Sequence, residues 1–123
     1  MSPKDERDSA PIEDQEIHIR VIGTTTVVDL PPMVRRTVAE KMGTLLGFII
    51  RSRPPTLLLN FSRVSRIESS GIAACLFAQK ECAEFGLRLG VFGVSPQVQR
   101  LFTIARIDEF FVFFADEASA LAG

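Results

Sequence analysis

The 123-residue sequence has few of the residues that form disulfides, metal sites and hydrolytic centres, with only two cysteines and one histidine. Cys75 and Cys82 are seven positions apart, which in a helix separates them by about 10 Å, too far for a disulfide. Neither cysteine has a second ligand at metal-binding spacing. We therefore expect two small buried side chains in a reducing cytoplasm, without a disulfide or a metal.

Neither excess charge nor a long apolar run is present. The 14 Lys and Arg residues nearly balance 15 Asp and Glu residues, giving a net charge of −1, so we expect no broad attraction to nucleic acid or anionic membranes. The longest apolar stretches are about as long as Ile72–Ala78, far short of the roughly 20 residues that span a bilayer. The charged start, Met1–Asp8, lacks the apolar region of a signal peptide, so we expect a cytoplasmic protein without membrane insertion.

The residues for two kinds of chemistry are also missing. No Gly-rich phosphate loop occurs, so we expect no bound nucleotide or other cofactor. His18 lies in a predicted strand near the start, with no acid or cysteine placed near it to form a site. A serine hydrolase needs a base beside its nucleophile, and the sequence offers none. These observations argue against a serine hydrolase.

The hydrophobic pattern divides the chain into a short lead-in and one domain. Residues 1–14 are mostly charged or small and show no periodicity, so we expect them to be disordered. Residues 15–123 alternate between strand and helix patterns. Strands are predicted over 17–22, 25–30, 56–61, 87–92 and 110–114. Helices are predicted from Asp29-Leu-Pro-Pro to Arg51, with Asp29 as the cap, and over 71–85, 96–105 and 116–121, the last two with Ser95 and Asp116 as caps. The apolar stripe of the helix 96–105 consists of Val98, Leu101, Phe102 and Ala105.

This order of elements predicts an α/β fold, a mostly parallel or mixed sheet of four to five strands flanked by about four helices. Strands joined through single helices are usually parallel neighbours, whereas the first two strands should form an antiparallel hairpin. Leu57–Phe61 and Leu87–Phe92 are almost continuously apolar, as expected of strands buried on both faces. We therefore expect these two strands to be adjacent and central.

A polar segment where a central strand gives way to a helix is the most informative part of the sequence. Glu68-Ser69-Ser70-Gly71 follows the predicted strand 56–61 and opens the helix 71–85, at the sheet edge where α/β proteins place their sites. Free amides at a helix start favour a negative charge, and Gly71 allows close approach. Spacing alone, however, favours a simpler interpretation, in which Ser70 is only the helix cap.

The run Leu57-Leu-Leu-Asn-Phe-Ser-Arg-Val-Ser-Arg-Ile-Glu-Ser-Ser-Gly-Ile-Ala-Ala resembles the signature of the STAS family of anti-sigma factor antagonists. The resemblance continues through the segments 86–102, 107–111 and 117–121, and it implies the same sheet-and-helix fold. It departs from the family in two places. Glu68 replaces the usual Asp, and the first half lacks a clear Gly-Glu-Leu-Asp stretch, for whose aspartate Asp29 is the best candidate.

The resemblance implies a function. In that family the serine after the acidic residue, here Ser69, is phosphorylated by an ATP-using anti-sigma kinase, and a serine phosphatase resets it. The unphosphorylated form binds the kinase and frees a sigma factor. The residues expected at the partner surface are Asp29, Arg63, Arg66, Glu68, Ser69, Ser70, Gly71 and Ile72. The alternative is a scaffold or regulatory subunit, as in stressosomes or lipid-transport ABC systems, without a phospho-switch. The oligomeric state is left open, with a homodimer as one possibility.

Overall fold

A five-stranded sheet forms the centre of the computed structural model, which describes residues 15–123. The disorder expected for residues 1–14 lies outside these described residues. The strands follow the order β1-β2-β4-β6-β7, with β1 at His18–Ile22, β2 at Thr25–Asp29, β4 at Thr56–Asn60, β6 at Arg88–Phe92 and β7 at Val112–Phe114. Strand β1 is antiparallel to β2, and the other neighbours are parallel. The predicted α/β class is confirmed, and so is the prediction that the two most apolar strands, β4 and β6, are adjacent and interior.

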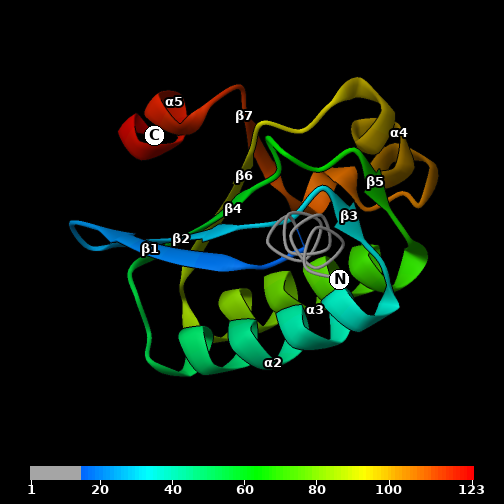
Figure 1. Cartoon of the computed structure of the whole chain (residues 1–123). Coiled ribbons are helices and arrows are strands. Elements are labelled where there is room, and N and C mark those ends of the chain that lie inside the picture. Colours follow the sequence, from blue (N-terminus) through cyan, green and yellow to red (C-terminus); the bar gives the residue numbers. More distant parts are fainter. Residues whose placement is uncertain (1–14) are drawn as a thin grey trace, which may run out of the picture.

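Helices cover the two faces of the sheet unequally. The helices are α2 at Arg36–Arg51, α3 at Ser69–Phe85, α4 at Pro96–Ile104 and α5 at Glu117–Ala122. Helices α2 and α3 lie side by side on one face, and the short α5 lies on the other (Figure 1). Because side chains alternate along a strand, Leu57 and Leu59 enter the core beneath α2 and α3, whereas Leu58 enters a smaller core beside α5. Within residues 15–123, no helix combines the length and hydropathy needed to cross a bilayer.

The predicted start of the first helix is wrong. The prolines at 31 and 32 lead instead into β3, Met33–Val34, which pairs in parallel with β5, Arg66–Ile67. The carbonyl of Pro32 accepts hydrogen bonds from the backbone N–H groups of Ser65 and Arg66, so this segment is held in extended form. Helix α2 therefore begins only at Arg36, and its N-cap residue, Arg35, makes no side-chain capping bond. We call the β3–β5 pair the mini-sheet.

The last predicted strand is shorter than expected. Asp108–Phe110 form a 3-10 turn, and β7 begins at Val112. The turn directs the Phe111 ring into the core, where its centroid lies 5.3 Å from that of Phe102. Two predicted caps are confirmed: the side chains of Ser95 and Asp116 accept hydrogen bonds at the starts of α4 and α5.

Candidate functional site

The segment Glu68–Gly71 lies where the mini-sheet meets α3. Glu68 is the N-cap residue of this helix, and its N–H donates to the carbonyl of Val34 at 2.9 Å. Ser69 is the first helical residue and is exposed to solvent. The backbone of Ser69 is thus held by the mini-sheet, while its hydroxyl remains accessible.

Gly71 is needed because the helix start packs directly against the mini-sheet. A Cβ atom at this position would lie 2.7 Å from Cγ1 of Ile67 and 2.7 Å from Cγ1 of Val34. These contacts are far shorter than the 3.5–4.0 Å at which carbon atoms pack well. The close approach fixes the first turn of α3 against both short strands and therefore fixes the position of Ser69.

Ser70 does not cap the helix, so the simpler interpretation of the Ser-Ser-Gly segment is wrong for this residue. The cap position is occupied by Glu68, without a side-chain capping bond. The Ser70 hydroxyl oxygen is buried and has no hydrogen-bond partner among the described residues. It lies beside a hollow of about 430 Å³ between α2 and α3, whose wall includes Arg36, Glu40 and Phe77. Ser69 is therefore exposed, whereas Ser70 is only partly exposed and its hydroxyl oxygen is buried.

An apolar groove runs between α3 and α4, with Ser69 in its wall. Its volume is about 460 Å³, and apart from Ser69 its lining is aliphatic: Ile67, Ile72, Ala73, Leu76, Leu101, Ile104, Ala105 and Ile107. Leu101 and Ile104 are exposed although both are large and apolar. The sequence pattern placed Leu101 and Ala105 on the apolar stripe of α4, but did not indicate that this stripe faces α3. We call this feature the α3–α4 groove.

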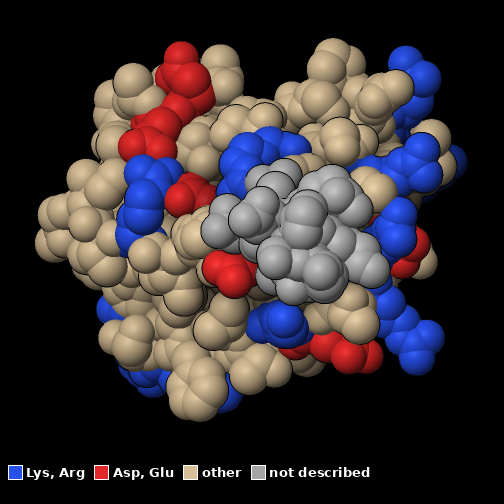
Figure 2. All heavy atoms as spheres, in the orientation of Figure 1, with Lys and Arg blue, Asp and Glu red and all other residues tan. Residues whose placement is uncertain are grey.

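Arginines lie around the site. Arg63 and Arg66 in the segment before Ser69, and Arg35 and Arg36 at the start of α2, are all exposed. Figure 2 shows Lys and Arg side chains along the side of the molecule on which Figure 1 places α4, β5 and the start of α2. Positive charge therefore accompanies the apolar groove, and Glu68 is the acidic residue next to Ser69.

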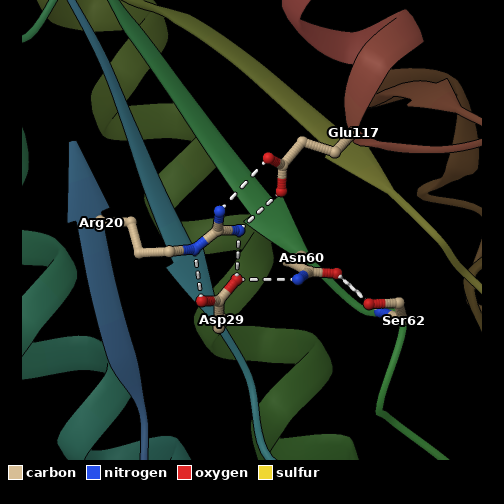
Figure 3. A network of polar contacts seen from close by, with 5 residues as sticks. All are labelled: Arg20, Asp29, Asn60, Ser62 and Glu117. Carbon is tan, nitrogen blue, oxygen red and sulfur yellow. Dashed lines mark hydrogen bonds and ion pairs between the residues drawn. The ribbon is translucent and has the colours of Figure 1, made fainter. Parts of the chain in front are cut away.

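Asp29, the remaining predicted site residue, belongs to a polar network at the other face of the sheet (Figure 3). Its carboxylate accepts two hydrogen bonds from the Arg20 guanidinium, at 2.7 and 2.8 Å, and one from the Asn60 amide at 2.7 Å. Arg20 also donates to Glu117 of α5, at 2.6 and 3.2 Å. The side-chain oxygen Oδ1 of Asn60 accepts from the backbone N–H and the hydroxyl of Ser62. The network thus joins α5 to the loop that leads toward Ser69.

The network also determines the charges of its members. Burial opposes ionisation of Asp29, but the hydrogen bonds from Arg20 and Asn60 outweigh it and lower the pKa of the carboxyl below its ordinary value. The hydrogen bonds to Asp29 and then to Glu117 raise the pKa of Arg20 above its ordinary range. Sequence reasoning missed Arg20, Asn60 and Glu117. The only available signal was Asn60, a polar residue at the end of an otherwise apolar strand.

The STAS domain family model matches residues 16–120 of this chain. The chain belongs to the STAS family. Several solved structures share its fold, among them the Bacillus cell fate determinant SpoIIAA in its phosphorylated form, at 20% identity and a TM-score of 0.71, with coverage of 87% of this chain and 97% of that one. An anti-sigma factor antagonist from Mycobacterium paratuberculosis is 18% identical, with a TM-score of 0.75 and coverage of 87% of this chain and 91% of that one. A STAS domain protein from Planctomyces limnophilus is 21% identical, with a TM-score of 0.79 and coverage of 86% of this chain and 95% of that one. A comparison with curated proteins finds no significant match. The resemblance to the STAS family and the STAS fold are confirmed.

Proposed function

We propose that this STAS domain is an anti-sigma factor antagonist that binds a serine-kinase anti-sigma factor and is switched off by phosphorylation of Ser69. The observation that carries the proposal is the exposed Ser69 hydroxyl on the first residue of α3, in the wall of the α3–α4 groove. A kinase can reach this hydroxyl, and the adjacent groove offers apolar surface to a partner. In this proposal the domain is a cytoplasmic binding module without catalysis, and a serine phosphatase resets it.

The docking surface in this proposal combines apolar and charged groups. Ile72 lies in the groove wall, and Glu68 and Ser70 flank Ser69. Gly71 is buried against the mini-sheet and contributes by fixing the first turn of α3. Arg63 and Arg66 offer charge to carboxylates of the partner. Asp29 contributes through the polar network, because Asn60 links its carboxylate to Ser62 in the loop before β5.

The direction of the switch follows from the different surroundings of a phosphate in the free and bound states. In the free domain the phosphate is in water at a helix N-terminus, a position that favours an anion by about 0.3–1 kcal/mol. In the complex it brings about −1.5 to −2 charges into a desolvated contact beside Glu68. A loss of about 1.4 kcal/mol in binding free energy weakens the affinity for the partner tenfold. A desolvated unpaired charge costs more than this. Phosphorylation should therefore release the partner.

Affinity measurements on two Ser69 variants test this switch. Ser69→Asp should weaken binding of the cognate anti-sigma kinase at least about tenfold, whereas Ser69→Ala should bind about as tightly as the native domain. Thr24→Asp provides a control, because Thr24 is an exposed residue in the turn between β1 and β2. It adds the same charge away from the groove and should leave the affinity unchanged. Isothermal titration calorimetry gives all four affinities.

Mass spectrometry after incubation with ATP and the kinase tests the modified residue. We expect phosphate on Ser69 and none on Ser69→Ala. Phosphate on Ser70, with Ser69→Ala still modified, would overturn the assignment. Equal binding by Ser69→Asp and Ser69→Ala would reject the switch and favour a scaffold or regulatory subunit of the stressosome or ABC lipid-transport kind.

A further inference from the structure

Strand β1 forms one edge of the sheet, where a row of backbone groups has no partner strand within the described chain. Edge strands are commonly protected from pairing by charged residues, prolines or bulges. Strand β1 has neither a proline nor a bulge over its five paired residues, and three of these, Ile19, Val21 and Ile22, are exposed and apolar. Among residues 15–123, nothing therefore covers this edge against another strand.

The side chains of β1 divide between the two faces of the sheet. Ile19 pairs with Val28, which lies in the core beneath α2 and α3, so Ile19 and Val21 point toward the helix side. Arg20 pairs with Val27 of the smaller core and points toward α5, where it binds Glu117. One face of the edge is thus apolar, whereas the other carries an arginine bound by carboxylates.

Helix α2 lies beneath β1 (Figure 1) and also carries apolar side chains on this side of the sheet. Leu45 of α2 and Ile17, just before β1, line a common hollow together with Gln15, Glu16 and Lys41. Phe48 follows Leu45 by three residues, which places both on the same side of the helix, and Phe48 is exposed. Leu45 is half-buried. Exposed large apolar side chains that gather on one surface are typical of interaction sites. We call Ile19, Val21, Leu45 and Phe48 the edge patch.

We infer that the edge patch is a homodimer interface, in which β1 pairs antiparallel with β1 of a second copy about a two-fold axis at Arg20. In this register Ile19 of each copy lies opposite Val21 of the other copy, so the exposed aliphatic side chains cover each other. The two Arg20 side chains also meet, but each is already bound by Asp29 and Glu117. The strand is therefore complementary to itself.

The α2 residues of the edge patch are needed because a pair of five-residue strands buries little surface. Specific interfaces bury about 1,200–2,000 Å² in total. In the two-fold arrangement, α2 of each copy lies beside α2 of the other, which brings Leu45 and Phe48 into the contact. This inference is independent of the proposed function, since the α3–α4 groove and Ser69 lie on other elements.

Sedimentation velocity tests the interface, over about 5–500 µM to cover weak association. The native chain should reach twice its mass of 13.6 kDa, and Val21→Lys should weaken association at least about tenfold. Ile104→Lys is the matched control, because Ile104 is 68% exposed and Val21 is 70% exposed. It should leave the dimer intact and weaken kinase binding, whereas Val21→Lys should leave kinase binding intact. A circular dichroism melt checks that both variants fold, and Val21→Thr, which retains strand propensity, should give a smaller loss of association.

Disulfide cross-linking tests the register. An equimolar mixture of Ile19→Cys and Val21→Cys should form cross-linked dimers faster than either variant alone, because residues opposite each other lie within disulfide distance. The native cysteines are both buried and should not compete. Three results would overturn the inference. The native chain could be a monomer at every concentration, Ile104→Lys could break the dimer while Val21→Lys does not, or the mixture of Ile19→Cys and Val21→Cys could cross-link no faster than either variant alone. A native chain that pairs only with a strand of another protein would overturn it as well.

Discussion

Replacing Arg20 with Met tests whether the polar network in Figure 3 stabilises the fold. The substitution keeps an unbranched side chain but removes the guanidinium that binds both Asp29 and Glu117. Exposed ion pairs contribute about 0.2–1 kcal/mol, and breaking a buried pair costs about 3–5 kcal/mol. The Arg20 and Asp29 side chains are 38% and 14% exposed, between these extremes. We therefore expect a loss of about 2 kcal/mol in the free energy of unfolding at neutral pH.

Urea unfolding followed by circular dichroism measures this loss, and for a domain of this size the melting temperature should fall by roughly 8 °C. Arg88→Met is the control, because Arg88 is an exposed arginine on β6 and no hydrogen bond or ion pair of its side chain is found within residues 15–123. It should change the stability by less than about 0.5 kcal/mol. Equal losses in the two variants would refute the argument.

The pH dependence separates charge from packing. The pKa of Asp29 is lowered in the folded chain from its ordinary value of 3.8, so the folded state binds fewer protons than the unfolded state near that pH. The stabilisation is therefore fully present above about pH 5 and is lost as the pH falls through the lowered pKa. The difference between the native chain and Arg20→Met should shrink over this acidic range. A constant difference from pH 7 to pH 3 would mean that Arg20 acts through packing.

Two further variants test the packing at the start of α3 by urea unfolding. Ser70→Ala should stabilise the domain by about 1 kcal/mol, because it removes a buried unpaired hydroxyl from a helix. Ser69→Ala, at an exposed position, should have little effect on the stability. Destabilisation by Ser70→Ala would show that the Ser70 hydroxyl has a hydrogen-bond partner. Gly71→Ala should cost about 1–3 kcal/mol because its Cβ would overlap the mini-sheet. The same change at Gly43, where a Cβ meets nothing within 4 Å, should instead stabilise α2 by about 1 kcal/mol; equal effects at the two glycines would contradict the overlap.

The sequence predicted the main sheet and the four helices because their signals are local. Apolar runs, alternation and caps such as Ser95 and Asp116 each depend on residues within a few positions. The mini-sheet could not be predicted in this way. It pairs Met33 with Arg66 across 33 positions over only two residues per strand, too short for a pattern. The same long-range pairing explains why Pro31 and Pro32 were assigned to the helix start.

Only part of the candidate site could be predicted, because the rest also depends on long-range contacts. The place of Ser69 at the start of a helix follows from its immediate neighbours, and the structure agrees. The groove beside it requires α3 and α4 to pack together, and the polar network requires β1, β2, β4 and α5 to meet. Arg20 in particular looks like an ordinary solvent-facing strand residue until Glu117, 97 positions away, is placed beside it.

The pairing of the mini-sheet limits how the chain length can vary. The loop between β4 and β5 is held at its start by the bonds between Ser62 and Asn60, and at its end by the Met33–Arg66 and Val34–Ile67 register. An insertion there that shifts the β3–β5 register would move Ile67 and Gly71 together, so that neither would face Val34. The turn at Gly23 has no such double attachment, and a Cβ there would meet nothing within 4 Å. Homologous sequences should therefore differ in length at the first hairpin much more readily than between Asn60 and Ser69.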